Sequence, residues 1–188
     1  MFFDGSDVGV TGELDAFHIL DADTILFSLA GSATLPGAGS VQDRDIIRFD
    51  ATSLGANTAG TLSLYFDGSD VGLGSSDEDI DALSVLPDGR IVISTLGNIS
   101  VSGASGVDKD LLAFTPTSLG ATTTGTWAMY FDGSDVGLTT TGEDIDGVAM
   151  AGNGAIYLST TGSFAVTGRS GADEDVFICA PTALGSTT

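Results

Sequence analysis

Short apolar runs alternate with polar, glycine-rich segments along the whole chain, most clearly between residues 65 and 131. Two of these runs flank Pro87-Asp88-Gly89, and Asp-Gly between apolar runs is a strong hairpin signal because glycine tolerates the positive φ of a tight turn. A glycine-rich segment, 97–108, reads as a loop between the second and third runs. The pattern predicts four antiparallel strands at 79–86, 90–95, 111–115 and 126–131.

The same order of elements is predicted before and after this segment. Asn153-Gly154 is expected to turn one strand, opened by Asp144-Ile145-Asp146, into the next, whereas Asp21-Ala22-Asp23-Thr24 is a weaker turn signal. The remaining strands are predicted at 14–20, 25–29, 46–49, 62–66, 155–159 and 175–179.

A nine-residue motif marks the start of each repeat of this pattern. Tyr-Phe-Asp-Gly-Ser-Asp-Val-Gly-Leu stands at 65–73 and again at 130–138, and a variant stands at 2–10. The chain therefore divides into repeats 1–64, 65–129 and 130–188, the last incomplete. Four antiparallel strands in each repeat of about 63 to 65 residues predict an all-β fold built of β-propeller blades. The alternative is a β-prism, in which three four-stranded sheets close around a threefold axis.

The charge is strongly negative, with 26 acidic residues against 5 basic ones and a net charge of −21. This balance argues against nucleic acid and anionic membrane surfaces, because both are bound through Lys and Arg. Metal cations, basic proteins and neutral sugars remain as partners. No apolar run reaches the ~18 residues of a membrane span, so no membrane insertion is expected. The chain begins and ends inside a repeat, so we expect adjoining repeats of a longer protein.

Most acidic residues fall in two kinds of connection, the link between repeats and the segment between the second and third strands. In a blade both connections lie on one rim, so we expect an acidic rim. Calcium could bridge these loops, since it takes six to eight oxygen ligands. Alternatively, the first Asp of each Asp-Gly-Ser-Asp caps its own turn, or the rim binds a basic partner. No strong calcium-loop signature is present. The candidate metal residues are Asp4, Asp7, Asp15, Asp67, Asp70, Asp81, Asp132, Asp135 and Asp146.

Few residues suit catalysis. His18 is the only histidine and lies in an apolar strand, where a core position is the simpler interpretation. The five basic residues, Arg44, Arg48, Arg90, Lys109 and Arg169, are not expected to recur at equivalent positions, so a phosphate site is not indicated. We therefore expect a non-enzymatic extracellular module with structural, adhesive or ligand-binding use, for which calcium is a candidate stabilising ion and the alternative is that no cofactor is bound. The alternative is a calcium-dependent or carbohydrate-active hydrolase.

The order Phe-Asp-Gly-Ser-Asp-Val-Gly, Asp-Ile-Asp, Ile-Tyr-Leu-Ser-Thr and Asp-Glu-Asp-Val-Phe resembles a repeat of secreted and surface-anchored bacterial proteins that have no established activity. The resemblance covers all three repeats and implies propeller blades and a secreted or cell-surface location. It also implies a second cysteine shortly after Thr188 as a disulfide partner for Cys179. The alternative for Cys179 is a free thiol in the core.

The two ends of the chain complement each other. Residues 2–4 read as the end of a fourth strand, and the last predicted strand, 175–179, is a third strand. Two copies joined head to tail would close a six-bladed ring as a homodimer, whereas an open series of copies would form a fibre. Trp127 shares a predicted strand face with Met129 and Phe131 and is expected to be buried between adjacent blades.

Overall fold

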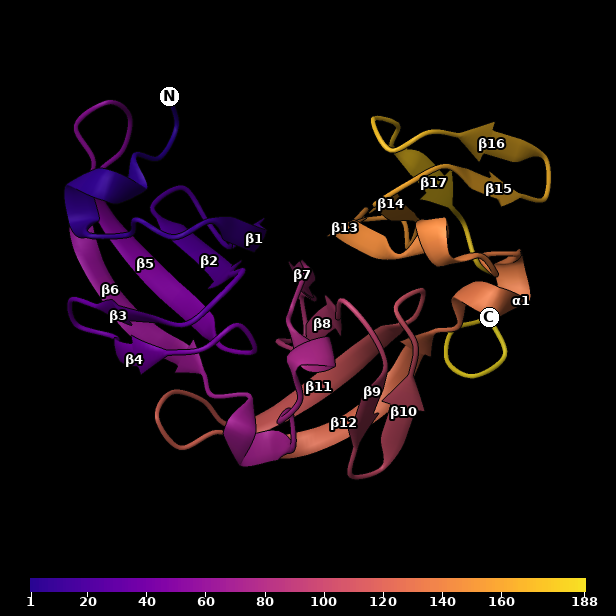
Figure 1. Ribbon diagram of the computed structural model, residues 1–188, viewed down its shortest axis with the longest axis horizontal. Coiled ribbons are helices and arrows are strands. Elements are labelled where there is room, and N and C mark those ends of the chain that lie inside the picture. The colour runs from indigo at the N-terminus through magenta and orange to yellow at the C-terminus, as the bar shows by residue number, and fades with distance from the viewer.

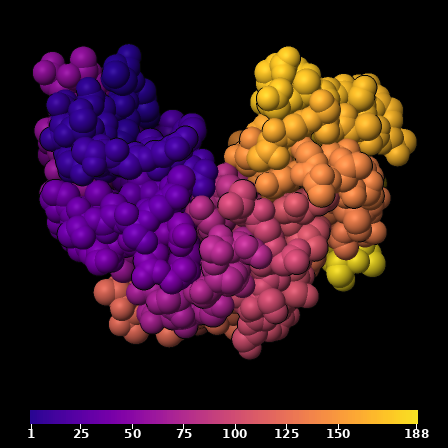
Figure 2. All heavy atoms as spheres, in the orientation of Figure 1, coloured from indigo at the N-terminus to yellow at the C-terminus, as the bar shows by residue number.

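The computed structural model describes the whole chain, Met1–Thr188, and is all-β. Three antiparallel sheets, numbered 1 to 3 in chain order, follow one another around an open arc. Sheets 1 and 3 lie on opposite sides of its opening (Figures 1 and 2). The predicted all-β class is confirmed. The β-prism alternative required the three sheets to close on one another, and the single chain does not close. No helix in the structure is long and apolar enough to pass through a bilayer.

Sheets 1 and 2 have four strands each, in chain order from the concave side of the arc outward. The alternation of apolar and polar residues predicted these strands, and only their ends differ, because the outer two continue past the expected turns. Sheet 1 contains β1 (Leu14–Ile19), β2 (Thr24–Leu29), β5 (Ile46–Ser53) and β6 (Ala59–Phe66). Sheet 2 contains β7 (Ala82–Val85), β8 (Ile91–Ser94), β11 (Leu111–Ser118) and β12 (Thr124–Phe131).

Sheet 3 repeats the plan with three strands. Its last strand, β17, pairs with β14 on one side and has no strand on the other. Glycines at the predicted Asp-Gly and Asn-Gly turns, Gly89 and Gly154, have positive φ values of 86°, which confirms both turns. The strands of sheet 3 are β13 (Ile145–Met150), β14 (Ile156–Thr160) and β17 (Phe177–Cys179).

A short hairpin interrupts each segment that was predicted as a loop between the second and third strands. These segments are rich in Gly and Ser and contain only single apolar residues at alternate positions, which is a weak strand signal. The hairpins are β3 (Ala33–Leu35) with β4 (Gly39–Val41), β9 (Ile99–Val101) with β10 (Ala104–Gly106), and β15 (Phe164–Val166) with β16 (Arg169–Gly171).

The core lies between neighbouring sheets. One apolar cluster joins sheet 1 to sheet 2 through Leu26, Phe66 and Phe114, and a second joins sheet 2 to sheet 3 through Leu111 and Phe131. Trp127 is buried in the first cluster, as predicted, with its ring 4.8 Å from that of Phe114.

The prediction that Phe131 shares the face of Trp127 is wrong. Leu111 pairs with Phe131, but the next residue, Leu112, pairs with Met129, so Tyr130 is an extra residue on β12. Such a bulge reverses the alternation of side chains. Met129 therefore packs toward sheet 1 with Trp127, and Phe131 packs toward sheet 3.

Candidate functional site

The first aspartate of each Asp-Gly-Ser-Asp motif caps a short helical turn. Its Oδ1 accepts hydrogen bonds from the backbone N–H and the hydroxyl of the serine two residues later. The Oδ1 to Oγ distances are 2.7, 2.6 and 2.6 Å in the three repeats. The predicted alternative of turn capping is thus confirmed for Asp4, Asp67 and Asp132.

The second aspartate of the motif accepts a hydrogen bond from a threonine of the sheet that follows the motif. Asp70 Oδ2 accepts from the backbone N–H of Thr123 at 2.9 Å, and the hydroxyl of Thr123 accepts from the backbone N–H of Asp67 at 2.9 Å. In the other two motifs, Asp7 and Asp135 accept from the backbone N–H of Thr58 and Thr188. The hydroxyls of these threonines accept from the backbone N–H of Asp4 and Asp132. Hydrogen bonding within the protein therefore accounts for the positions of these carboxylates at the Asp-Gly-Ser-Asp loops.

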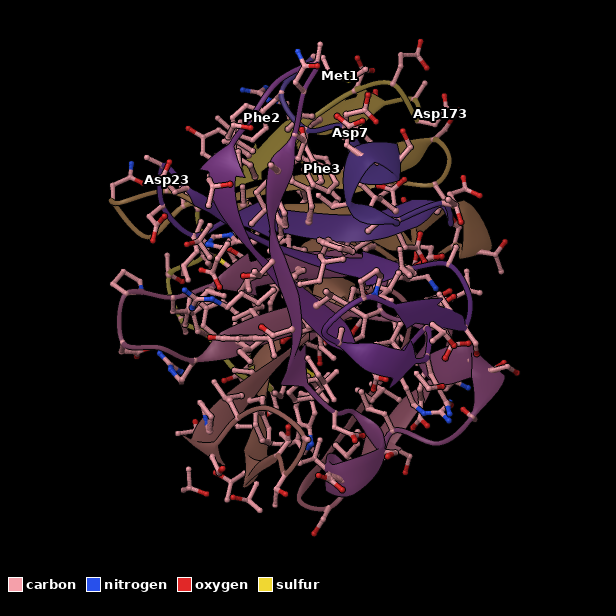
Figure 3. The ribbon with its side chains drawn as sticks, turned by 90° about the vertical axis from the view of Figure 1, so that its left-hand side faces the viewer. Met1, Phe2, Phe3, Asp7, Asp23 and Asp173 are labelled. Atoms are coloured by element: carbon pink, nitrogen blue, oxygen red, sulfur yellow. The ribbon has the colours of Figure 1, made fainter.

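The link between sheets starts at the outermost strand and ends at the innermost one, so it separates the acidic residues into two groups. Asp67 and Asp70 lie against the Gly120–Thr123 turn of the next outer hairpin, whereas Asp79 and Asp81 lie where β7 begins. Both predicted acidic connections nevertheless meet at one edge of the sheets, since the backbone N–H of Ile80 donates to the carbonyl oxygen of Asp43 and that of Gly68 donates to Asp45 Oδ1. Figure 3 shows Asp7 and Asp173 toward one side of the molecule and Asp23 at the other.

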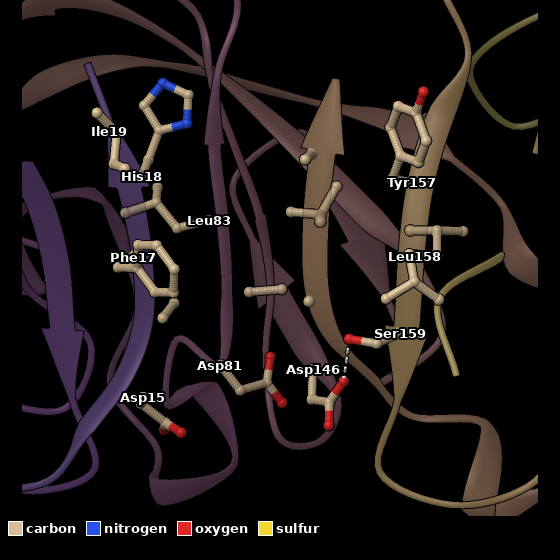
Figure 4. Close-up of a pocket in the computed structure, with 16 residues that line it drawn as sticks. Asp15, Phe17, His18, Ile19, Asp81, Leu83, Asp146, Tyr157, Leu158 and Ser159 are labelled. Carbon is tan, nitrogen blue, oxygen red and sulfur yellow. Dashed lines mark hydrogen bonds between the residues drawn. The ribbon is translucent and has the colours of Figure 1, made fainter. Parts of the chain in front are cut away.

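The inner group lines the concave side of the arc. Asp15, Asp81 and Asp146 stand at equivalent positions at or next to the first residues of β1, β7 and β13, and they line one groove of ≈ 490 Å³. Figure 4 shows the three carboxylates at one end of this groove, with Phe17, Leu83 and Leu158 above them. Asp146 accepts a hydrogen bond from Ser159 Oγ at 2.7 Å.

Asp81 is the most enclosed of the three. It is 4% exposed, and neither oxygen of its carboxyl group has a hydrogen-bond partner. Burial, followed by the nearby charges of Asp144, Asp15 and Asp79, raises the pKa of Asp81 to about 9. This carboxyl group is therefore protonated at neutral pH unless a cation offsets its charge.

Two aspartates that were not among the candidate metal residues belong to the same cluster. Asp79 and Asp144 are buried, and one oxygen of each has no partner. Burial, together with Asp15 and Asp43, raises the pKa of Asp79 to about 7. Burial, together with Asp108 and Asp146, raises the pKa of Asp144 to about 7. The repeated Asp-Ile-Asp spacing was the signal that could have found them, because alternate residues enter a strand on the same side.

Two basic residues border the cluster. Arg44 forms an ion pair with Asp43 at 3.5 Å, and Lys109 forms one with Asp108. Their carbonyl oxygens pack on Gly68 and on the equivalent glycine, Gly133. Arg44 and Lys109 therefore occupy equivalent positions, and the expectation that no basic residue recurs is wrong. The shared Asp-x-Asp pattern, Asp43-Arg44-Asp45 and Asp108-Lys109-Asp110, was the signal that could have shown the equivalence of these two residues.

His18 and Cys179 lie away from the carboxylates. Figure 4 places His18 at the opposite end of the groove from Asp15, Asp81 and Asp146. Burial lowers the pKa of His18, so its ring is neutral at neutral pH. Cys179 is a free thiol that packs against the core between sheets 2 and 3, and burial raises its pKa. Neither residue is placed to act with the aspartates.

No group of three His, Cys, Asp or Glu side chains stands ready to hold one metal ion in this arrangement. No protein-family model, curated protein or solved structure matches the chain. The chemistry that remains is that of a buried carboxylate cluster, which can hold protons or attract a cation.

Proposed function

We propose that the three sheets are consecutive blades of a β-propeller and that the chain is a non-enzymatic, extracellular structural module. In this proposal the propeller is completed by a second copy of the chain. The observation that carries the proposal is that residues buried between neighbouring sheets are exposed at the two ends of the arc. The arrangement of each sheet, with its first strand on the concave side and its last strand outermost, supports the blade interpretation.

The free face of sheet 1 has the composition of a blade contact. Phe17 holds the position in β1 that Leu83 holds in β7, yet Phe17 is 63% exposed and Leu83 is 2% exposed. Leu14 and its equivalent Ile80 differ in the same way. Leu83 and Ile80 are covered because sheet 1 packs against them, whereas no sheet covers Phe17 and Leu14.

The free face of sheet 3 is its counterpart. Val176 and Ile178 correspond to Leu111 and Ala113, which pack against sheet 3. Val176 is 68% exposed, whereas Leu111 is fully buried. Within the chain, faces of these two kinds pack against each other twice, so the most economical occupant of each free face is the opposite end of another copy.

Polar groups at the ends complement each other as well. The buried carboxylate of Asp110 accepts from the backbone N–H of Gly133 at 3.0 Å, and Asp45 accepts from Gly68 in the same way. The equivalent carboxylate, Asp175, accepts only from Ala172 within the chain. Gly5 occupies the position of Gly68 and Gly133 in the motif, so its N–H would supply the missing donor from the second copy.

The N-terminal segment already lies as the end of a preceding outer strand would. The carbonyl oxygen of Phe2 accepts from Gly55 N–H at 2.8 Å, just as Tyr65 and Tyr130 accept from Gly120 and Gly185. The free edge of β17 is the place that such a strand occupies in sheets 1 and 2. Two copies of three blades would give a six-bladed ring.

A structural or adhesive use is favoured over catalysis because the conspicuous polar groups recur in each repeat and mostly bond to the backbone. The hydrolase alternative needs groups that act together, and His18 lies apart from the carboxylates. The net charge of −21 suits a soluble module outside the cell.

Light scattering coupled to size exclusion tests the assembly. We expect a mass of about twice 18.9 kDa, independent of dilution over a broad range. Phe17→Asp or Ile178→Asp should each give a monomer, since either one charges the interface. Leu96→Asp is the matched control, because Leu96 is also exposed but lies in the turn that follows β8. A wild-type mass near 18.9 kDa would contradict the dimer and leave the end faces to adjoining repeats of a longer chain.

A further inference from the structure

The acidic end of the groove and the residues just before it contain buried carboxylate oxygens that accept no hydrogen bond. Both oxygens of Asp81 lack a hydrogen-bond partner although the residue is 4% exposed, and one oxygen each of Asp79 and Asp144 is in the same situation. Buried polar atoms are almost always paired, and a buried anion is costly unless a cation or several donors offset it. A set of such atoms from neighbouring sheets therefore requires an explanation.

The charges that face this cluster come from every element around it. Glu13 lies directly before β1, and Asp15 is the second residue of that strand. Asp43 and Arg44 lie before β5, and Asp108 and Lys109 lie before β11. Asp146, on β13, completes the set. Arg44 and Lys109 pair with Asp43 and Asp108, their own neighbours in sequence. No basic side chain is bonded to Asp81, Asp15 or Asp144, so the centre of the cluster has an excess of negative charge.

We propose that this inner cluster binds one divalent cation of the calcium type, with Asp81 as the central ligand and Asp15 and Asp144 as its neighbours. Carboxylate oxygens are the ligands that such hard cations prefer, and backbone carbonyls and water would complete the six to eight positions. The carboxylates must turn inward to share one ion, because three do not converge as they stand. The outer Asp-Gly-Ser-Asp loops are the poorer site, since their carboxylates already accept backbone and hydroxyl hydrogen bonds.

Calorimetric titration of the chelator-treated protein with calcium chloride is the test. At about 1 mM calcium, where extracellular calcium modules are half saturated, we expect about one bound ion per chain and a higher melting temperature. Asp81→Asn should weaken binding roughly tenfold or more. Asp77→Asn is the matched control, because Asp77 is an exposed residue of the same link and undergoes the same change of side chain. It should bind calcium as the wild type does.

Two results would overturn the proposal. One is a wild-type melting temperature that is the same in calcium and in chelator, and the other is an equal loss of calcium affinity in Asp81→Asn and Asp77→Asn. Asp15→Asn provides a second variant if Asp81→Asn fails to fold. The oligomeric mass is measured in the same samples, so loss of the dimer and loss of the ion are told apart.

Discussion

The backbone N–H of Gly133 donates to Oδ1 of Asp110 at 3.0 Å, and this bond ties the start of one link to the loop before β11. The other oxygen of Asp110 accepts from Val107 N–H at 2.9 Å. Asp110→Ala should leave two backbone donors of a buried region without partners and lower the free energy of unfolding by about 2–4 kcal/mol. Denaturant titration measures this loss.

Asp175→Ala is the matched control for that variant. Asp175 is exposed and accepts one hydrogen bond within its chain, from Ala172 at 3.0 Å. Its loss should change the unfolding of the single chain by less than about 1 kcal/mol. In the proposed dimer the same change should instead weaken association. An equal loss of stability in the two variants would contradict this assignment.

Gly133 itself tolerates no side chain. A Cβ atom at this position would collide with the carbonyl oxygen of Lys109, which belongs to backbone and cannot turn aside. Gly133→Ala should therefore destabilise the protein by about 2 kcal/mol or more, through strain or loss of the Asp110 bond. Gly152→Ala is the control, since a Cβ there meets nothing within 4 Å. Comparable melting temperatures for both variants would contradict the close contact.

Stability should fall as pH rises when no divalent cation is present. The native pKa of Asp81, about 9, and those of Asp79 and Asp144, about 7, lie above the ordinary value of 3.8. Between these values the native protein binds more protons than the unfolded chain, so the free energy of unfolding decreases with pH. In chelator, the melting temperature at pH 9 should lie below that at pH 5.

Asp81→Asn removes the largest part of this pH dependence. The amide is uncharged at every pH, so the variant should melt above the wild type at pH 9, by roughly 4–8 °C for a gain of about 2 kcal/mol. At pH 5 the difference should be small, because the wild-type carboxyl group is then protonated. A wild-type melting temperature that does not change between pH 5 and pH 9 would count against the buried cluster.

Trp127 reports on the contact between sheets 1 and 2. Its ring is buried beside Phe66 and Phe114, and its Nε1–H donates to the carbonyl oxygen of Val71 at 3.1 Å. Its fluorescence should be blue-shifted and weakly quenched by acrylamide. Because it is the only tryptophan, the signal is unambiguous. Trp127→Phe should cost about 1–2 kcal/mol through the lost hydrogen bond and packing. Strong quenching in the folded protein would contradict the burial.

The sequence by itself determined the properties that depend on neighbouring residues. Alternation of apolar and polar positions located the strands, and the Asp-Gly and Asn-Gly pairs located the turns at Gly89 and Gly154, because a tight turn needs a positive φ. The capping of a turn by Asp67 was equally local, since the serine that it binds is two residues away. The burial of Trp127 followed from its place in an apolar strand.

Only the tertiary structure determined the features that depend on contacts between residues far apart in the sequence. The extra residue Tyr130 reverses the face of Phe131 only because of how β12 pairs with β11. The path of the link from the outermost to the innermost strand separates Asp70 from Asp81, and only the folded arc brings Asp81 near Asp15 and Asp144. The burial of an aspartate and the repulsion from nearby charges depend on residues of several sheets. The residue pattern within one strand therefore does not predict them.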